Sequence, residues 1–439
     1  MSSKKAILKI RKMRLYLPCG FLLLLALLLS GCSQAVPKSI AMPNTPVELI
    51  PSPIRCMQPA CTNPRPYIST IDNIHLEQIF SYHIPDPRSI ARYYDFVWGA
   101  DIDQLAAFRA GNPNIQLSYY IPFNRDNGTF DDAEQGRKHG LAYWKNFHPD
   151  WILYQCDRTT PAYEDNDPNM PLVFSNPAVV EWQLQTYARP AMAAGYDAIA
   201  ADNVDLQNFY GACGYYQNGT WIQRYTGQHD DPQWQADVIQ WTALMQAGLH
   251  RLQRPLALIP NLALGSISPT APVIQELIDH VDGVLDEGGF TNYANGYVTG
   301  DQWAQMIDFI RNVQQQFKPY YLINQYKSTP LSQAQIQWAL SSYLMAKDRL
   351  STVFISGDQQ YGADLRYPEY AAAIGTPQGN MYKNQQVYWR KYSNGLVIVN
   401  PSASTRYTVT LDKSYLDAYG NHINKMVTLQ PHSGMILLN

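Results

Sequence analysis

Short apolar runs alternate with longer amphipathic segments along most of the chain. The apolar runs are nearly continuous, as expected for parallel strands buried on both faces. Strands are predicted at 67–69, 96–99, 116–121, 198–202, 256–261, 283–287, 320–324 and 352–356. Helices are predicted at 177–195, 233–252, 271–279, 301–316 and 332–347. This α/β alternation predicts a (β/α)8 TIM barrel over residues 65–384, and an open doubly wound sheet is the rival architecture.

Local signals mark the ends of several helices. Pro177 follows Asn176, which indicates a helix start, and Pro190 predicts a kink or break further along the same segment. Asp301 and Ser332 are predicted N-caps, because short polar side chains satisfy the free N–H groups of a first helical turn.

Two segments do not fit the barrel pattern. The run 151–155 would make a ninth strand, and we interpret it as an excursion after the third strand because the following residues are loop-like. After about residue 385 the chain shows only short strands separated by turns, at 386–392, 396–400, 407–411, 426–429 and 435–438. Residues 385–439 are therefore predicted to form a small, β-sandwich-like antiparallel domain. Packing against the barrel is its expected role, and sugar binding is the alternative.

The N-terminus carries a targeting signal. Six Lys and Arg residues between positions 4 and 14 precede a short apolar run, 21–29, and then Leu29-Ser30-Gly31-Cys32. This arrangement resembles the lipobox of bacterial lipoproteins, in which the Cys is acylated, and an ordinary signal peptide is the alternative. Residues 1–31 are thus a predicted signal peptide, Cys32 a predicted lipidation site, and residues 32–64 a flexible tether. Ser33 favours the outer membrane of a bacterial envelope.

Composition narrows the class of ligand. The chain has a formal net charge of −3 and no basic stripe, which argues against a nucleic-acid partner. It contains 31 Tyr and 10 Trp, and aromatic faces stack on sugar rings, although plain packing also explains such rings. After cleavage, four cysteines remain besides the acylated Cys32, which predicts disulfides Cys56–Cys61 and Cys156–Cys213, with free thiols as the alternative.

Two carboxylates lie at predicted strand ends, where the active sites of barrels are found. Active sites lie at the C-terminal ends of the strands, where Asp202 ends the fourth predicted strand and Glu287 the sixth. Glycoside cleavage needs one ionised and one protonated carboxyl group across the scissile bond. We therefore predict Asp202 and Glu287 as the catalytic pair, with a helix cap or salt bridge as the alternative for Asp202. Asp205 and Asp286 compete for the acid role.

An ordered set of motifs resembles a known family. Residues 195–205 look like the fourth-strand motif of glycoside hydrolases of the hypothetical glycosyl hydrolase 15 grouping, and are similar to endo-α-1,4-polygalactosaminidase-like barrels. Ile259-Pro260-Asn261, Leu285-Asp286-Glu287-Gly288, Ser356-Gly357-Asp358 and the tail 431–438 fit the same pattern. The resemblance covers the chain from about residue 65. It implies Asp202 as nucleophile and Glu287 as acid/base, with retention of configuration.

Further residues at or beyond strand ends are predicted to contact a sugar, although packing or loop hydrogen bonding explains each of them equally well. They are Trp98, Tyr120, Asn124, Arg125, Asn203, Asn261, Phe290, Asn324 and Asp358.

Other chemistries have weaker support. The nine His residues show no HExxH spacing, and no phosphate-binding or nucleophile-elbow motif is present, so no metal and no cofactor are expected. Asp165, Asp167 and Asn169 imitate the start of a calcium loop, but Met170 stands where a Gly is needed. The main hypothesis is a monomeric, membrane-anchored retaining glycoside hydrolase with a polysaccharide or oligosaccharide substrate. The alternative is a non-catalytic carbohydrate-binding lipoprotein.

Overall fold

The computed structural model describes residues 74–127, 139–164, 169–264 and 267–439. The predicted signal peptide, tether, Cys32, Cys56, Cys61 and strand 67–69 lie outside these ranges. No helix in the described part of the chain is both long enough and apolar enough to cross a bilayer.

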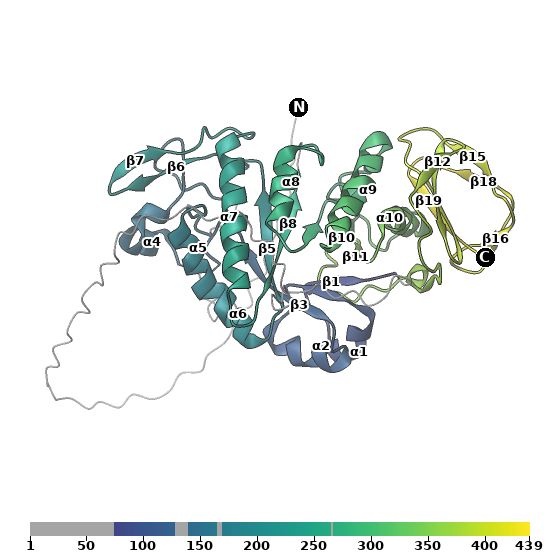
Figure 1. Cartoon of the computed structure of the whole chain (residues 1–439), viewed down its shortest axis with the longest axis horizontal. Helices are drawn as coiled ribbons and strands as arrows, with labels where there is room; N and C mark the ends of the chain where they lie inside the picture. Colours follow the sequence, from purple (N-terminus) through teal and green to yellow (C-terminus); the bar gives the residue numbers. More distant parts are fainter. Residues whose placement is uncertain (1–73, 128–138, 165–168, 265–266) are drawn as a thin grey trace, which may run out of the picture. The chain divides into compact units, whose positions relative to one another are not determined.

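Eight parallel strands form one sheet, and each pairs with the barrel strand before and after it in the chain (Figure 1). They are β1 (Glu77–Ile79), β2 (Phe96–Trp98), β3 (Gln116–Pro122), β5 (Ala198–Asp205), β8 (Ala257–Ala263), β9 (Val284–Asp286), β10 (Tyr320–Gln325) and β11 (Ser351–Ser356). The last strand returns to the first, because Val353 N donates to His75 O at 3.0 Å and Val353 forms a parallel bridge with Leu76. This topology confirms the TIM barrel and excludes the open sheet.

The first described strand of the barrel is β1, about ten residues after the predicted strand 67–69, which lies outside the described residues. Strand β1 has only three residues, and Glu77 and Gln78 are both fully buried. A strand this short with two buried polar side chains does not give the continuous apolar run by which the other seven were found.

Helices alternate with the barrel strands. The described helices are α1 (Pro87–Ile90), α2 (Leu105–Gly111), α4 (Leu141–Phe147), α5 (Pro177–Gln183), α6 (Arg189–Ala194), α7 (Pro232–His250), α8 (Pro272–Asp279), α9 (Gly300–Gln315) and α10 (Gln333–Ala346). Short 3-10 turns accompany them at Ala91–Tyr93, Ile102–Gln104, Pro149–Trp151, Gly289–Thr291 and Pro368–Ala371.

The structure gives the outcome of three predictions about helix ends and interruptions. In the segment predicted to kink or break at Pro190, α5 ends at Gln183 and passes into α6 through a π-helical turn, Leu184–Ala188, just before Pro190. A π turn changes the local hydrogen-bond pattern, so it can accommodate a residue that lacks an N–H group. The N-cap of α9 is Thr299, and Asp301 lies in the first turn instead. Ser332 is confirmed as the N-cap of α10, where it forms a capping box with Gln335.

The run 151–155 lies outside the barrel sheet, as predicted. It contributes β4 (Tyr154–Gln155) to a three-stranded sheet with β6 (Ala212–Gln217) and β7 (Thr220–Gln223). The β6–β7 hairpin was not predicted. Its turn residues Asn218 and Gly219 both have positive φ, at 50° and 77°, as the tight turn between two twisted strands requires.

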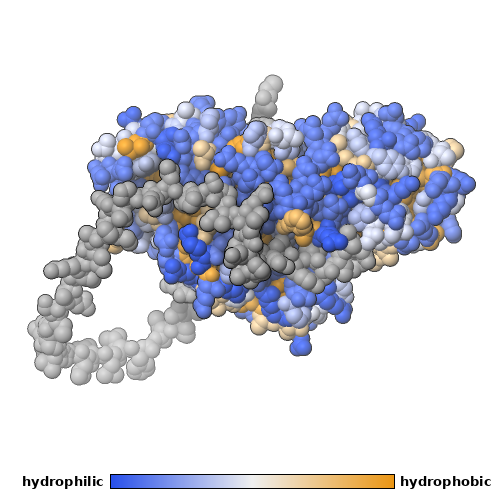
Figure 2. Space-filling model, in the orientation of Figure 1, coloured by the Kyte–Doolittle hydropathy of each residue, from blue (hydrophilic) through white to orange (hydrophobic). Residues whose placement is uncertain are grey.

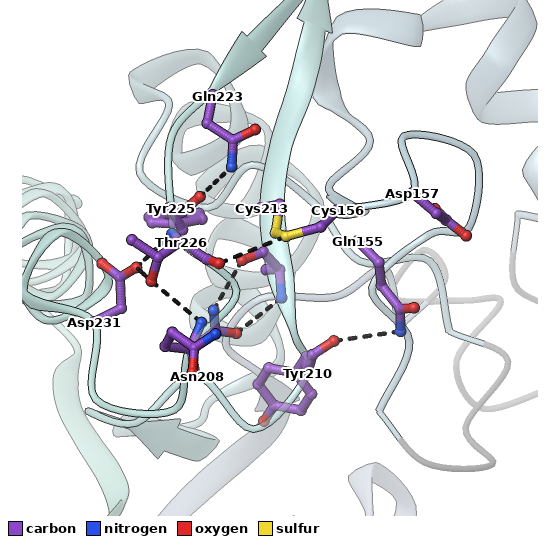
Figure 3. Close-up of a disulfide and its surroundings, with 12 residues drawn as sticks. Gln155, Cys156, Asp157, Asn208, Tyr210, Cys213, Gln223, Tyr225, Thr226 and Asp231 are labelled. Carbon is purple, nitrogen blue, oxygen red and sulfur yellow. Dashed lines mark hydrogen bonds between the residues drawn. A yellow bond between two sulfur atoms is a disulfide. The ribbon is translucent and has the colours of Figure 1, made fainter.

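A disulfide ties this small sheet together. Cys156, directly after β4, is bonded to Cys213 of β6 (Figure 3), which is the predicted pairing. Gly227 packs against both sulfur atoms, because a Cβ there would lie only 2.6 and 2.7 Å from them. The bond therefore joins two long excursions, one after the third barrel strand and one after the fourth.

The C-terminal domain consists of two antiparallel sheets. Its strands are β12 (Tyr382–Asn384), β13 (Val387–Tyr392), β14 (Gly395–Asn400), β15 (Tyr407–Thr410), β16 (Tyr415–Leu416), β17 (His422–Ile423), β18 (Met426–Leu429) and β19 (Ser433–Leu438). Strand β12 pairs with β13, so the sheet begins just before the predicted boundary at 385. The strands β14 and β19 lie against α10. The face drawn in Figure 2 is mostly hydrophilic, with apolar residues in small scattered patches.

Arg390 anchors this domain to the end of α10. Its buried guanidinium donates through Nη1 to the carbonyls of Leu344, Met345 and Lys347, at 2.9, 3.0 and 2.6 Å. It also donates through Nη2 to Asp348 Oδ1 at 2.9 Å. A cation at this end satisfies carbonyls that no helical N–H reaches and complements the helix dipole.

We expect Glu77→Gln to remove a pH dependence of stability. Burial raises the pKa of Glu77 to about 8, whereas the unfolded chain ionises this carboxyl near 4.5. Between these values only the folded state keeps the proton, so the wild-type protein loses stability as the pH rises. The Tm advantage of the variant over wild type should therefore grow between pH 5 and pH 8. A Tm difference that stays constant between pH 5 and pH 8 would contradict this. An equal growth of the Tm difference in the exposed control variant Glu276→Gln would also contradict it.

Candidate active site

The strand period places one ring of polar residues at the mouth of the barrel. Inward-facing side chains, among them Ala200, Ile259, Leu285 and Ile323, fill the barrel with an apolar layer. Two residues further along each strand, the next inward positions are polar. They are Asp202 on β5, Asn261 on β8, Glu287 just after β9 and Gln325 on β10.

A β-bulge shapes the end of β5. Ala201 pairs with Pro260 and Val204 with Leu262, so Asp202 and Asn203 together lie opposite Asn261. Asn203 takes up the extra residue in a left-handed conformation, with φ of 55°. Bulges of this kind redirect side chains next to active sites. Because of the bulge, the consecutive side chains of Asp202 and Asn203 belong to two different hydrogen-bonded clusters.

One amide bridges the two predicted catalytic carboxylates. Asn261 Nδ2 donates to Asp202 Oδ1 and to Glu287 Oε2, in both cases at 2.9 Å. Because both oxygens lie 2.9 Å from the same nitrogen, they can be no more than twice that distance, about 5.8 Å, apart. The structure therefore brings together residues that lie far apart in the chain.

Each carboxylate has further donors on its other oxygen. The Tyr120 hydroxyl donates to Asp202 Oδ2 at 2.7 Å. The Tyr361 hydroxyl and Gln325 Nε2 donate to Glu287 Oε1, at 2.8 and 3.1 Å. Burial and the neighbouring carboxylate raise the pKa of both tyrosines, so they remain protonated donors at neutral pH.

The two acids differ in their electrostatic environment. Burial, and next the charge of Asp202, raise the pKa of Glu287 above its ordinary value. The hydrogen bonds from Tyr361, Asn261 and Gln325 act in the opposite direction but do not cancel this effect. The net effect favours the protonated form of Glu287.

A second polar cluster lies beside the pair. The Asn203 amide donates to Glu164 at 3.0 Å, and Arg125 forms an ion pair with the same carboxylate. Both Asn203 and Arg125 were predicted to contact a sugar, and the structure holds them in one network next to Asp202. Asp358 is exposed at the rim of a neighbouring cavity of about 320 Å³, which Gln325 and Tyr361 also line.

Several residues predicted to contact a sugar are buried, and they stay predictions. Trp98 is only 3% exposed and packs in the apolar layer of the barrel, where a sugar cannot stack on it. Phe290 and Asn324 are fully buried, and Asn324 Oδ1 accepts from Phe290 N at 2.9 Å, which fixes the turn after β9. Asn124 is buried as well, and its backbone carbonyl accepts from Leu172 N at 2.8 Å.

The competing acids do not contact the pair. Asp286 faces away from the barrel interior and accepts from Gly289 N at 3.0 Å and from Tyr320 at 2.8 Å. Asp205 accepts from the Tyr210 hydroxyl at 3.1 Å, and burial raises its pKa to about 7. Each of these carboxyl groups is thus held by its own local partners.

Four residues of the site were not predicted: Phe80, Glu164, Gln325 and Tyr361. The Phe80 ring lies between the rings of Tyr120 and Tyr361, at centroid distances of 5.5 and 6.3 Å. Gln325 follows Asn324 directly, and the strand period alone favours it as the inward residue. The other three lie in connecting segments, where no periodicity indicates which side chain faces the site.

Comparison with known proteins identifies a family. Residues 109–396, more than half of the chain, match hypothetical glycosyl hydrolase family 15. No curated protein matches the sequence.

Solved structures with a related shape include a maltogenic α-amylase from Thermotoga neapolitana. It has 12% identity and a TM-score of 0.46, and the match covers 84% of this chain and 98% of that one. An α-amylase from Malbranchea cinnamomea has 11% identity and a TM-score of 0.44, covering 84% and 96%. A GH31 dextranase from Flavobacterium johnsoniae has 10% identity and a TM-score of 0.41, covering 85% and 52%.

We expect Asn261→Ala to raise the pKa of Glu287 further, because it removes a hydrogen bond that favours the carboxylate form. Titration of protein labelled with ¹³C at the glutamate carboxyl carbons should show this as a shift of one resonance midpoint to higher pH. Asn203→Gly is the matched control, since glycine accepts the left-handed backbone and the lost amide contacts Glu164 instead. An unchanged midpoint in Asn261→Ala would contradict the bridging role.

Proposed function

Because the chain belongs to hypothetical glycosyl hydrolase family 15, we propose that Asp202 and Glu287 cleave glycosidic bonds in a polysaccharide with retention of configuration. The observation that carries the proposal is the shared amide of Asn261, which limits the distance between the nearest carboxylate oxygens to about 5.8 Å. Retaining enzymes hold their carboxyl groups about 5–5.5 Å apart, whereas inverting enzymes need about 6.5–9.5 Å to admit a water.

The environments of the two acids support a division of roles. Asp202 is the proposed nucleophile, and the donors Tyr120 and Asn261 stabilise its ionised form. Glu287 is the proposed acid, because burial and the adjacent charge favour its protonated form.

The reaction then takes two steps. In the first, an Asp202 oxygen bonds to the anomeric carbon while the bond to the leaving oxygen breaks and Glu287 protonates that oxygen. In the second, Glu287 takes a proton from water, the resulting hydroxyl bonds to the anomeric carbon, and Asp202 is released. Protons and bonds balance without any further reactant, so no cofactor is proposed.

We expect Asp202→Asn and Glu287→Gln each to lower kcat by about 10²–10⁴-fold while the fold is retained, because each variant removes one of the two acids. The measurement is release of reducing ends from a panel of purified polysaccharides, together with thermal unfolding. Asp286→Asn is the matched control, since this buried acid adjoins Glu287 in sequence but faces away from it. Full activity in either catalytic variant would refute the assignment.

The stereochemistry gives an independent check. Proton NMR of the first product should show the anomer of the substrate, before mutarotation mixes the two forms. Glycan binding by the wild-type chain without any hydrolysis would instead favour a non-catalytic carbohydrate-binding protein.

We also propose that this monomeric enzyme is held at the bacterial envelope, in the outer membrane, through acylated Cys32. The lipobox-like Leu29-Ser30-Gly31-Cys32 and the tether-like composition of residues 32–64 support this. Metabolic labelling with a radioactive fatty acid should mark the wild-type chain, and Cys32→Ala should abolish the label. A labelled Cys32→Ala chain would exclude this residue as the lipidation site.

A further inference from the structure

The C-terminal domain contains a cavity that is separate from the carboxylate pair. It has a volume of about 630 Å³ and lies between the strands β12–β14 and the segment 410–415. None of its lining residues hydrogen-bonds to Asp202 or Glu287. Its volume falls within the range of about 300–1,000 Å³ that is typical of pockets for small ligands.

The cavity combines an aromatic floor with a polar rim. Trp389 and Tyr415 line the floor but are only 5% and 7% exposed and belong to the core of the domain, so the ring that a sugar can reach is that of Tyr382. Tyr382 is 40% exposed at the edge, and Asn384 and Lys391 are exposed beside it. Such a surface suits a sugar, whose C–H face packs on an aromatic ring while its hydroxyls hydrogen-bond to polar neighbours.

Asp412 provides the acceptor at this rim. The Tyr415 hydroxyl and Lys413 N donate to its Oδ1, at 2.8 and 3.0 Å, so Oδ2 remains for the hydroxyl of a ligand. The hydrogen bond from Tyr415 lowers the pKa of Asp412, so the carboxylate is ionised at neutral pH. Tyr382 and Asp412 line the same cavity, and burial, followed by the charge of Asp412, raises the pKa of Tyr382.

The floor is held rigidly in place. The Lys413 ammonium lies over the Tyr415 ring, 5.0 Å from its centre, and Trp389 Nε1 donates to Asn384 O at 2.8 Å. A site that is already ordered loses little conformational entropy when a ligand binds.

We propose that this cavity is a second carbohydrate-binding site, which holds a segment of the polysaccharide while another segment reaches Asp202 and Glu287. The class of ligand rests on the proposed function, whereas the site itself rests on the exposed ring of Tyr382 and on Asp412 at the rim of one cavity. Binding at two sites raises the effective concentration of the polymer at the catalytic pair.

The test measures binding by the full chain in an Asp202→Asn background, which prevents turnover. The probes are cellulose, chitin, starch granules and xylan, by sedimentation or affinity electrophoresis. At least one polymer should bind, and Tyr382→Ala and Asp412→Ala should each weaken this binding about tenfold. Phe317→Ala is the matched control, because this ring is 85% exposed and does not line the cavity.

The outcomes separate this site from the catalytic one. Unchanged binding in Tyr382→Ala, or no binding of any polymer, overturns the second site. Binding that depends on Tyr382, without hydrolysis by the wild-type chain, refutes the hydrolase proposal but leaves the second site standing. If both proposals hold, Tyr382→Ala slows hydrolysis of the polymer much more than hydrolysis of a short soluble oligosaccharide.

Discussion

Two carboxyl groups share one amide at the mouth of this barrel, and the rest of the site follows from that constraint. Like charges at this separation, in surroundings that exclude much of the water, cannot both ionise freely. Two features of the site reduce this electrostatic repulsion. Donors from Tyr120, Asn261, Gln325 and Tyr361 surround the pair, and burial favours a proton on Glu287. The resulting asymmetry between two similar groups is what acid–base chemistry requires.

The alternation of side chains along a strand decides which residues reach that mouth. Asp286 and Glu287 are neighbours in sequence, yet Asp286 fixes the turn after β9 whereas Glu287 contacts Asn261 and so joins the pair. The turn itself depends on Gly289, whose φ is 48° and where a Cβ would collide with Ile323 O. The bulge at Asp202 and Asn203 interrupts the same alternation on β5, so that both residues contribute to the polar surface.

A feature of this structure could be predicted from the sequence where its signal lies within one short segment of the chain, and not where it depends on tertiary packing. Seven barrel strands were found because strands buried on both faces are continuously apolar, and β1 was missed because Glu77 and Gln78 are polar. The two carboxylates that share Asn261 could be predicted to lie together because strand ends are identifiable positions in a barrel. Tyr361 and Glu164 were not predicted because they come from connecting segments, whose path depends on tertiary packing. On β10 the strand period favours Gln325 over the predicted Asn324 as the inward residue.

The contact of Arg390 with α10 bears on how the chain is divided. The last carbonyls of this barrel helix find their partner in a buried side chain from the β domain. A barrel cut off near residue 385 would lose these hydrogen bonds and expose the end of α10, and the detached tail would separate Arg390 from its carboxylate partner Asp348. The tail is therefore expected to fold together with the barrel, which disfavours its exchange as an independent module.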